Sequence, residues 1–342
     1  LETNVISGTD INACLSNKTV MKMNILVTGG AGYIGSGLIL KLGEEFPEAT
    51  ITSIDNLTTG DYQYIDYLKK EERYRFLVGD IRKRSDAKKA ITQDTDIILH
   101  LAALSGVEAC RKQPKKAVDT NFYGTHLLLE EAANHNVERF VFTSSAAVYG
   151  IPQKQPITEE HPLEPINLYG ITKLGSEKLV NACYTNTGLT TTIFRLSNVY
   201  GVSAYTQWES VIPKFVWQAA NDQPLTIRGN GEQQRNFVHV QDVIDAIIQG
   251  FKAPKKVVAG ETFNLGGESL SVNNIAEIVT QEAKRKLGKE ALRVFVPPLS
   301  GEVYTSEFNY SSKKISQKID YKPKKGLSKG VSELFVFASK VK

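Results

Sequence analysis

Thr28-Gly-Gly-Ala-Gly-Tyr-Ile-Gly35 follows directly on Met23-Asn-Ile-Leu-Val27, an apolar and β-branched run that predicts a buried strand. Gly29, Gly32 and Gly35 have the spacing of a dinucleotide-binding loop: the first glycine makes the turn and the second admits a pyrophosphate. The third glycine lets the next helix pack closely on the strand. Apolar residues at helical spacing do follow, at Ile34, Leu38, Ile39 and Leu42. The stretch therefore predicts the first strand, loop and helix of a dinucleotide-binding domain.

Asp55 stands at the end of the next strand-like run, in Ser53-Ile-Asp55, twenty residues beyond Gly35. A carboxylate at this place accepts hydrogen bonds from a ribose 2′-hydroxyl and would repel a 2′-phosphate. Thr58, Thr59 and Gly60 supply no arginine to hold such a phosphate. The cofactor predicted from these residues is NAD rather than NADP.

Strand-like and helical patterns alternate through the first two hundred residues, with apolar, β-branched runs at 23–28, 50–54, 75–78, 97–101, 140–144 and 191–196. This alternation predicts an α/β fold with a Rossmann-type, doubly wound parallel sheet over residues 23–200. Ligands bind at the carboxyl ends of such strands. Residues 201–342 are less regular and predict mainly a smaller, C-terminal substrate-binding lobe.

Tyr169 and Lys173, in Tyr169-Gly-Ile-Thr-Lys173, are neighbours on one face of a helix. A free tyrosine ionises at about pH 10, so it is a poor base at neutral pH. An ammonium beneath the phenol would favour its ionised form, and an oxidised nicotinamide would add a second positive charge. The pair can therefore transfer protons, although Tyr-x-x-x-Lys by itself also occurs on ordinary helices.

Further motifs occur in order along the chain: Asp55-Asn56-Leu57, Gly79-Asp80-Ile81, Leu101-Ala102-Ala103, Asn121-x-x-Gly124-Thr125, Ser144-Ser145-Ala-Ala-Val-Tyr149-Gly150, Arg195-Leu-Ser-Asn198 and Arg235-Asn-Phe-Val-His239-Val-x-Asp242. Together with the glycine loop and the Tyr169 pair, they resemble the extended short-chain dehydrogenase/reductase family over nearly the whole chain. The likeness is to its NAD-dependent nucleotide-sugar epimerase/dehydratase branch, typified by UDP-glucose 4-epimerases. The resemblance also implies that segments near 237–250 and 262–265 return to the large domain.

The resemblance implies a role for each motif. Tyr169 is the base, Lys173 lowers its pKa and holds the nicotinamide ribose, and Ser145 bonds the reacting sugar oxygen. The implied NAD contacts are Gly29, Gly32, Tyr33, Ile34, Gly35, Asp55, Asn56, Asp80, Ile81, Leu101, Ala102, Ala103, Asn121 and Ser144, with Tyr169 and Lys173. The implied contacts to a nucleotide-sugar substrate are Ser105, Ser145, Asn198, Val211, Leu225, Ile227 and Arg235. His239 lies in an apolar run and is interpreted as structural.

The residues after Ser145 decide between reaction types. By resemblance, 4,6-dehydratases carry acidic residues there, because elimination of water needs an acid and a base. This chain has Ala146-Ala147, whose methyl groups cannot transfer protons. Dehydration and the related decarboxylation of uronic acids are therefore disfavoured. Epimerisation at C4 through a 4-keto sugar is favoured, most simply on a UDP-hexose or UDP-N-acetylhexosamine. A nucleotide-sugar 4-ketoreductase or dehydrogenase and a non-catalytic NAD-binding protein remain the alternatives.

One position departs from the family pattern. Where relatives carry a second arginine that clamps the substrate diphosphate, the chain reads Pro298-Leu299-Ser300-Gly301-Glu302. Leucine donates no hydrogen bond. Glu307 falls near the position that sorts substrates by their 2-substituent. These differences bear on which substrate is used, and the nucleotide base and hexose stay open.

A homodimer is also implied by the resemblance, through helices around 114–135 and 169–187. Their apolar stripes are Leu127, Leu128 and Ala132 beside Glu131, and Leu174, Leu179 and Ala182. Such stripes also occur in ordinary cores.

The composition is that of an enzyme without nucleic-acid or membrane partners. The 342 residues carry a net charge of +4, with the C-terminal lysines spread out rather than clustered. No apolar run is long enough to span a membrane. Cys14, Cys110 and Cys183 show no metal-binding spacing and leave an odd count, which favours a reducing, cytoplasmic location. Residues 1–22 are polar and are interpreted as a flexible leader or an expression remnant.

Overall fold

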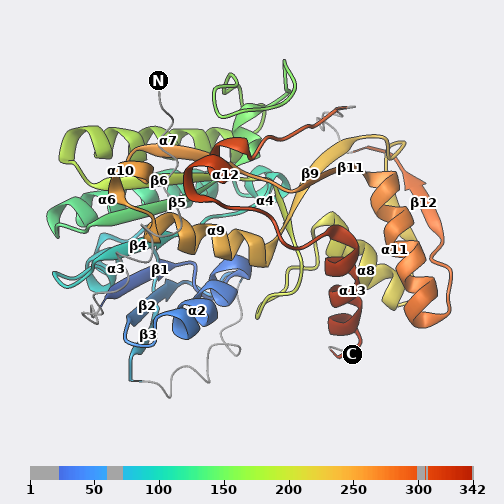
Figure 1. Cartoon of the computed structure of the whole chain (residues 1–342), viewed down its shortest axis with the longest axis horizontal. Coiled ribbons are helices and arrows are strands. Elements are labelled where there is room, and N and C mark those ends of the chain that lie inside the picture. The colour runs from blue at the N-terminus through green and yellow to red at the C-terminus, as the bar shows by residue number, and fades with distance from the viewer. Residues whose placement is uncertain (1–22, 60–71, 299–304, 306, 341–342) are drawn as a thin grey trace.

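A computed structural model describes residues 23–59, 72–298, 305 and 307–340 of the chain. The expected leader (1–22) and Leu299 lie outside these residues. A seven-stranded sheet, in the order β10-β6-β5-β4-β1-β2-β3, forms the large domain (Figure 1). Its strands are β1 Asn24–Thr28, β2 Thr50–Asp55, β3 Tyr74–Val78, β4 Ile97–His100, β5 Arg139–Ser145, β6 Thr190–Leu196 and β10 Glu261–Leu265.

Every neighbouring pair in this sheet is parallel. The doubly wound parallel sheet predicted from the sequence is confirmed, with the six predicted strands placed within one residue at each end. The chain winds outward from β1 through β2 to β3, and then in the other direction through β4, β5 and β6. The sheet therefore has a switch point between β1 and β4, where such folds bind ligands.

Helices cover both faces of the sheet (Figure 1). On one face, α2 Tyr33–Glu45 and α9 Val240–Lys252 pack with the strands into the largest apolar core. On the other, α3 Arg84–Ala90, α6 Gly124–Asn134 and α7 Leu168–Thr187 enclose a second core. Because both faces are covered, all residues of β4 and β6 are buried, and these strands have no exposed polar face.

Short elements link the strands and helices of these layers. They are α4 Val107–Lys112, α5 Pro114–Ala117, a π-helical turn η3 Val118–Tyr123, a 3₁₀ turn η4 Ala146–Tyr149, α10 Lys255–Val258 and α12 Lys313–Ile319. α12 packs beside β10, with Ile315 in the core of the large domain.

The smaller lobe has its own core. Its helices are α8 Val211–Ala220, α11 Val272–Leu287 and α13 Leu327–Ala338, and its paired strands are β8 Leu225–Arg228 with β12 Arg293–Val296. A three-stranded sheet of β11 Glu268–Ser271, β9 Gln234–His239 and β7 Asn198–Tyr200 joins the lobe to the large domain. β9 leads directly into α9, so residues of the lobe and of the large domain alternate along the chain.

A buried ion pair fastens the long helix α7 to β6. Arg195 donates to both carboxylate oxygens of Glu177, from Nε at 3.0 Å and from Nη2 at 2.8 Å. Its Nη1 reaches the Tyr149 hydroxyl at 2.7 Å, and that hydroxyl donates to Asn264 Oδ1 at 2.6 Å. The pair therefore also ties in β10, where Asn264 lies.

Among the described residues, no helix has the combination of length and apolar content needed to cross a membrane.

Candidate active site

A cleft of about 1630 Å³ lies along the carboxyl ends of the sheet strands, with the small lobe as its second wall. The glycine loop after β1, the end of β2, the segment after β4, the end of β5 and the start of α7 all contribute to it. From the lobe side come residues 205–210, Arg235, Thr305, Phe308 and Phe337. The elements that carry the sequence motifs thus meet in one place.

The glycine loop is shaped by close backbone approach. Gly29 has a φ of +73°, and a Cβ there would lie 2.8 Å from the Ala102 nitrogen. A Cβ on Gly35 would collide with the Gly29 carbonyl oxygen. No described side chain caps the N-terminus of α2, and its first turn holds no acidic residue. Tyr33, Ile34 and Gly35, the first residues of α2, line the cleft. Their backbone N–H groups and the partial positive charge of the helix N-terminus suit a pyrophosphate.

Asp55 holds the loop to the sheet. Its carboxylate accepts the N–H of Ala31 at 3.1 Å and that of Leu57 at 2.8 Å. Burial raises the pKa of Asp55, and these backbone bonds oppose the shift. Asn56 also lines the cleft. Each carboxylate oxygen keeps a lone pair for a ribose hydroxyl, so this end of the cleft suits the adenosine half of NAD.

Asp80 differs from its sequence interpretation. Its side chain turns to Arg82, which holds both carboxylate oxygens at 2.9 and 3.0 Å through Nε and lowers the pKa of Asp80. Asp80 does not line the cleft, whereas Gly79 and Ile81 on either side of it do. Its motif therefore shapes the strand end, and the neighbouring residues form the wall.

A buried hydrogen-bond chain sets the segment after β4. The Ala102 N–H donates to Thr28 Oγ1 at 3.1 Å, and Thr28 Oγ1 lies 2.7 Å from His100 Nδ1. His100 Nε2 lies 2.9 Å from Thr125 Oγ1, whose hydrogen goes to the Asn121 carbonyl at 2.6 Å. Because Thr125 gives its hydrogen to Asn121, His100 must donate from Nε2, and Nδ1 accepts the hydrogen of Thr28. The His100 ring is therefore neutral, with its proton on Nε2. Burial lowers the pKa of His100 to about 3, which agrees with that state.

Asn121 is a structural residue rather than a cleft residue. Its Oδ1 accepts the Leu104 N–H at 2.7 Å, and its Nδ2 donates to the Leu104 carbonyl at 3.1 Å and to Thr172 Oγ1 at 3.0 Å. With all these bonds made inside the protein, the side chain holds the cleft segment from behind. Leu101, Ala102, Ala103 and Ser105 then line the cleft as expected.

Tyr169 lies in the first turn of α7, where Asn167 caps the helix by accepting the Gly170 N–H at 2.9 Å. A Cβ on Gly170 would collide with the Ala147 carbonyl, so the helix start is pressed against η4 and brings Tyr169 beside Ser145. Burial raises the pKa of Tyr169, and side-chain hydrogen bonds with Ser105 and Ser145 oppose the shift. The structure thus brings these three cleft residues together.

Lys173 is anchored to β5 and not held by the phenol. Its Nζ donates to the Thr143 carbonyl at 2.8 Å and lies 4.8 Å from the centre of the Phe142 ring. The hydroxyls of Ser105 and Ser145, rather than this ammonium, are what lower the pKa of Tyr169 in the structure. Burial lowers the pKa of Lys173 to about 8, so the side chain is protonated at neutral pH and two of its hydrogens remain available.

The lobe side only partly matches the sequence interpretation. Asn198 and Arg235 line the cleft, and Asn198 is steadied by donating to the Asn236 carbonyl at 2.9 Å. Leu225 and Ile227 do not line it: both are fully buried in the core of the lobe, because β8 faces α8 and α11. Val211 packs against the same core. The cleft residue beside it is Ser210, at the start of α8, which no described side chain caps.

Several cleft residues carried no sequence signal. Trp208 and Phe337 stack in the lobe wall with ring centres 6.0 Å apart, although Phe337 lies on α13, far along the chain from the last motif. Thr120 and Ser197 line the cleft with buried hydroxyls that have no hydrogen-bond partner among the described residues, as does the expected cofactor contact Ser144. Their hydroxyls are available to a ligand.

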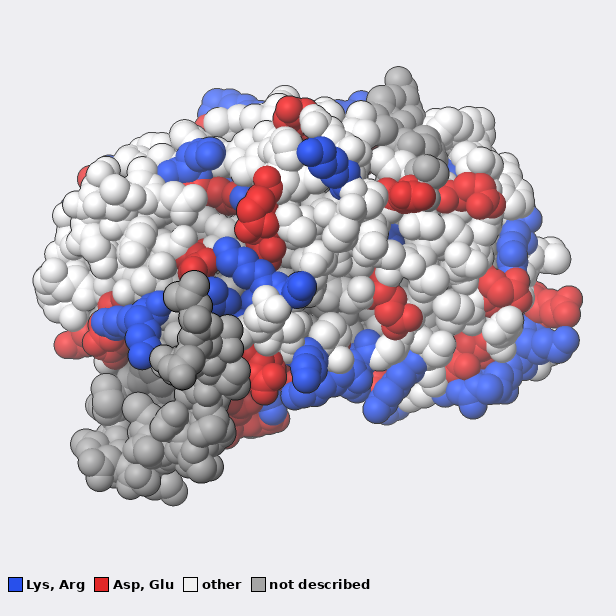
Figure 2. All heavy atoms as spheres, turned by 45° about the horizontal axis from the view of Figure 1, so that its top comes forward, with Lys and Arg blue, Asp and Glu red and all other residues white. Residues whose placement is uncertain are grey.

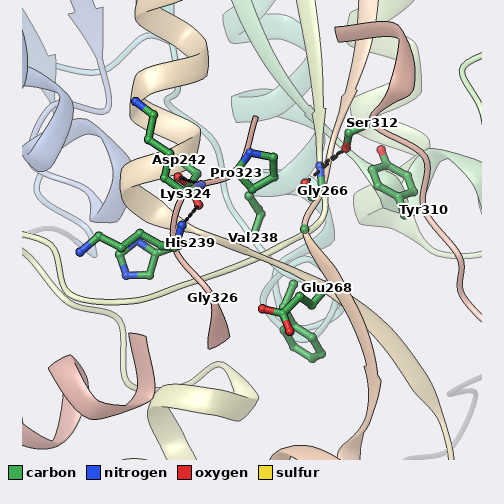
Figure 3. Close-up of a pocket in the computed structure, with 13 residues that line it drawn as sticks. Val238, His239, Asp242, Gly266, Glu268, Tyr310, Ser312, Pro323, Lys324 and Gly326 are labelled. Atoms are coloured by element: carbon green, nitrogen blue, oxygen red, sulfur yellow. Dashed lines mark hydrogen bonds between the residues drawn. The ribbon is translucent and has the colours of Figure 1, made fainter. Parts of the chain in front are cut away.

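A second hollow of about 380 Å³ lies between β9, Gly266 and residues 323–326 (Figure 3). Its polar groups serve the protein itself: Asp242 accepts the N–H groups of Lys324 at 2.9 Å and Lys325 at 3.2 Å. His239 accepts the Gln241 N–H at 3.2 Å through Nδ1 and caps α9, and burial lowers its pKa to about 4. His239 thus has the structural role expected of it, and the hollow is a joint between the C-terminal segment and the sheet.

The chain is similar to known proteins over most of its length. The NAD dependent epimerase/dehydratase family matches residues 25–266. A UDP-glucose 4-epimerase of Lactobacillus helveticus is 36% identical over 259 residues, 71% of this chain and 76% of that protein. A dTDP-D-glucose 4,6-dehydratase of Homo sapiens is 31% identical over 315 residues, 90% of this chain and 88% of that protein. Among solved structures, a UDP-glucuronic acid 4-epimerase from Bacillus cereus, in complex with UDP-glucuronic acid and NAD, superposes with a TM-score of 0.84 at 29% identity. The superposition covers 94% of this chain and 100% of the Bacillus cereus chain.

Proposed function

Because this chain belongs to the NAD-dependent epimerase/dehydratase family, we propose that it inverts C4 of a nucleotide-diphosphate hexose. A UDP-hexose or a UDP-N-acetylhexosamine is the proposed substrate, and a 4-keto sugar is the transient intermediate. The observation that carries the proposal is the wall beside Tyr169, where Ser145 is followed by two alanines that line the cleft. This wall can support oxidation and reduction at one carbon but supplies no side chain for elimination.

NAD is the cofactor, and the residues present fit it. The uncapped start of α2 suits the pyrophosphate, Asp55 suits the adenosine ribose, and Lys173 has hydrogens free for the nicotinamide ribose. When bound, NAD supplies the hydride acceptor for oxidation at C4 and the donor for its return.

The protein residues handle the proton. Tyr169, as its phenolate, would take the proton of the sugar 4-hydroxyl and give it back after the sugar has turned. Ser145 Oγ accepts the Ala147 N–H at 3.2 Å and bonds with the Tyr169 hydroxyl, which places the serine hydroxyl where it could bond the sugar oxygen as well. The protonated Lys173 contributes a fixed positive charge in a buried setting. Oxidised nicotinamide would add a positive charge that favours the phenolate, against the effect of burial on the pKa of Tyr169.

Elimination of water is disfavoured on the same grounds, although 4,6-dehydratases occur among the relatives. Dehydration needs an acid for the leaving hydroxyl and a base for the carbon-bound proton. Ala146 and Ala147 occupy the positions directly after Ser145 and line the cleft. Neither can do either task.

The substrate diphosphate has two supports on the lobe side. Arg235 lines the cleft, and the uncapped start of α8 at Ser210 offers backbone N–H groups with a positive helix end. In relatives, a second arginine binds part of the negative charge of the diphosphate, whereas this chain has Leu299 there, outside the described residues. Arg235 and the start of α8 can bind that part of the charge instead. We therefore keep the nucleotide-diphosphate sugar as the proposed substrate.

The test is incubation with UDP-glucose and, separately, with UDP-N-acetylglucosamine. We expect the C4 epimer of at least one, at unchanged mass, without added NADH. Loss of water seen by mass spectrometry would contradict the proposal. A protein inert in this assay that reduces a 4-keto nucleotide sugar with NADH would be a ketoreductase instead.

NAD should bind more tightly than NADP. The Asp55 carboxylate is held in place by Ala31 and Leu57, so it would face a 2′-phosphate without moving away. A coupling of about 1–3 kcal/mol corresponds to roughly 5- to 150-fold in affinity. Calorimetric titration with both cofactors measures the ratio, and a lower dissociation constant for NADP would show that Asp55 does not act in this way.

We also propose a homodimer, with an interface that differs from the expected stripes. Leu127, Leu128, Ala132 and Glu131 are buried within the subunit, and Leu174 and Leu179 pack against its inner clusters. Exposed apolar residues on η3 and α7 include Phe122, Tyr123 and Ile171, of which Ile171 is 52% exposed. Charged side chains are sparse over the end of the molecule where α6 and α7 lie (Figure 2). Such a face suits a second copy of the chain.

Ile171→Asp should therefore yield monomers, because a buried charge at a subunit interface lacks a partner. Light scattering at micromolar concentration gives the mass. Leu292→Asp is the matched control, since Leu292 is 73% exposed on the lobe, away from this face. A wild-type protein that is already monomeric, or an Ile171→Asp protein that stays dimeric, would rule out this interface.

A further inference from the structure

The loop between β7 and α8, residues 201–210, is bonded to the cofactor-binding helix α2. The second half of this loop, residues 205–210, lines the cleft from the lobe side. Its first residue, Gly201, accepts a hydrogen bond from the Tyr33 hydroxyl through its carbonyl, at 2.7 Å. Its Tyr205 N–H donates to Ser36 Oγ at 3.1 Å. The two bonds join the start of α2 to a cleft wall that lies 168 and 169 residues further along the chain.

The helix α2 and this loop are also packed closely together. A Cβ on Gly37 would lie 2.6 Å from Ser203 Oγ, so no side chain fits between the helix and the loop at that point. On the other side of the loop, Gly201 has a φ of +115°, and a Cβ there would collide with the ring of His239. The start of the loop is therefore enclosed between α2 and β9, and its position depends on the position of α2.

Tyr33 takes part in both the cofactor site and this loop. Its backbone belongs to the first turn of α2, where the pyrophosphate of NAD is expected, and its ring packs against the largest core. Burial raises the pKa of Tyr33 well above its usual value, so the hydroxyl keeps its hydrogen and donates it to Gly201. One side chain thus connects the phosphate end of the cofactor site to the lobe-side wall.

We propose that Tyr33 is a positioning residue that couples cofactor binding to nucleotide-sugar binding. A pyrophosphate at the start of α2 would fix the backbone of Tyr33, and the bonded hydroxyl would then fix Gly201 and the wall that follows it. A site held in shape in advance loses less freedom when its ligand binds. NAD should therefore strengthen nucleotide-sugar binding, and by linkage the nucleotide sugar should strengthen NAD binding by the same factor. The inference rests on the cofactor and substrate proposed above and adds how their two sites are connected.

Tyr33→Phe tests the connection, because phenylalanine keeps the ring and the backbone and removes only the hydroxyl. ADP-ribose and UDP are the probes, titrated by calorimetry into protein freed of retained nucleotide by charcoal treatment. In wild type, saturating ADP-ribose should lower the dissociation constant of UDP by roughly fivefold or more, as is usual for coupled sites. In Tyr33→Phe this gain should shrink by roughly threefold to tenfold, the effect of one neutral hydrogen bond. ADP-ribose alone should bind both proteins nearly equally, since the backbone N–H of residue 33 is kept.

Tryptophan fluorescence gives a second readout, which follows the wall itself. The chain has two tryptophans, Trp208 in the loop and Trp217 on α8, and their ring centres lie 5.2 Å apart. The tryptophan emission of the protein therefore comes from this wall. ADP-ribose lacks the nicotinamide, so a change in emission cannot arise from contact with that ring. We expect ADP-ribose to change the emission of wild type and to change that of Tyr33→Phe much less.

Tyr74→Phe is the matched control. Tyr74 is a buried tyrosine on β3 whose hydroxyl lies 2.8 Å from Ser53 Oγ, and it is not among the residues that line the cleft. Like Tyr33→Phe, this variant deletes one hydrogen-bonded hydroxyl and keeps the ring. It should retain both the coupling between ADP-ribose and UDP and the change in emission seen in wild type.

The outcomes separate the inference from the proposed function. Absence of coupling in wild type, or equal coupling in wild type and Tyr33→Phe, would overturn the inference alone. A loss of ADP-ribose affinity in Tyr33→Phe of the same size without UDP would also overturn it, because the hydroxyl would then serve the cofactor site itself. Failure of wild type to bind ADP-ribose would overturn the cofactor assignment, and failure to bind UDP would overturn the proposed substrate.

Discussion

Tyr169→Phe is expected to lower the turnover number about 10²–10⁴-fold while NAD stays bound. Phenylalanine keeps the ring in the first turn of α7 and deletes only the hydroxyl that bonds with Ser105 and Ser145. Proton transfer to the sugar oxygen then has no base. Because the rest of the cleft is unchanged, the Michaelis constant should change far less than the turnover number.

The measurement combines steady-state kinetics with calorimetric titration of NAD. Tyr184→Phe is the control, since Tyr184 lies on the same helix but outside the cleft. The wild-type rate should rise with pH until the phenol is ionised, and this rise should be absent from the residual activity of Tyr169→Phe. Near-normal turnover by Tyr169→Phe would mean that another group is the base.

Glu177→Ala is expected to lower the free energy of unfolding by about 3–5 kcal/mol. Arg195 and Glu177 are 5% and 1% exposed, so the alanine leaves a guanidinium buried without its counter-charge. The arginine also bonds Tyr149, and through it Asn264 on β10, so the loss reaches α7, β6 and β10 together. Glu177 is one turn beyond Lys173, and activity should fall with stability.

Glu108→Ala is the matched control for this variant. Arg111 holds Glu108 with the same geometry, from Nε at 3.0 Å and from Nη2 at 2.8 Å, but at the surface. Its removal should leave the unfolding free energy nearly unchanged, because solvent screens exposed pairs. Urea unfolding of both variants gives the comparison. Equal, small effects would show that the buried pair contributes little.

The sheet could be predicted from the sequence because its central strands, such as β4 and β6, are buried on both faces. Residues 97–101 and 191–196 are mostly apolar or β-branched, interrupted only by His100 and Arg195, and the glycine loop predicted the order of the first strand and helix. The residues that line the cleft after β1, β4 and β5 could be predicted for the same reason. In a doubly wound sheet, a residue that ends a strand lies at the ligand edge.

The remaining differences arise from contacts between distant parts of the chain. Leu127 and Leu128 were expected to face a second subunit, and Leu225 and Ile227 were expected to contact the substrate. All four are instead buried within the subunit. Lys173 was expected to pair with the residue four positions away, whereas a strand carbonyl at Thr143 lies close enough to hold it. Thr120 belongs to a π-helical turn, which has no simple sequence pattern.

The place of β10 in the sheet has a consequence for how the chain is made. β10 is the outermost strand beside β6, yet it is synthesised only after the first half of the lobe and α9. On the ribosome, the nascent chain can pair its first six strands while β6 still has an open edge. Phe194 on β6 also lacks its stacking partner until Phe263 on β10 has been made; in the folded protein their ring centres lie 5.9 Å apart. Exposed strand edges promote aggregation. A chain whose translation stops at Ala253 should therefore aggregate, even though it contains the glycine loop, Ser145, Tyr169 and Lys173.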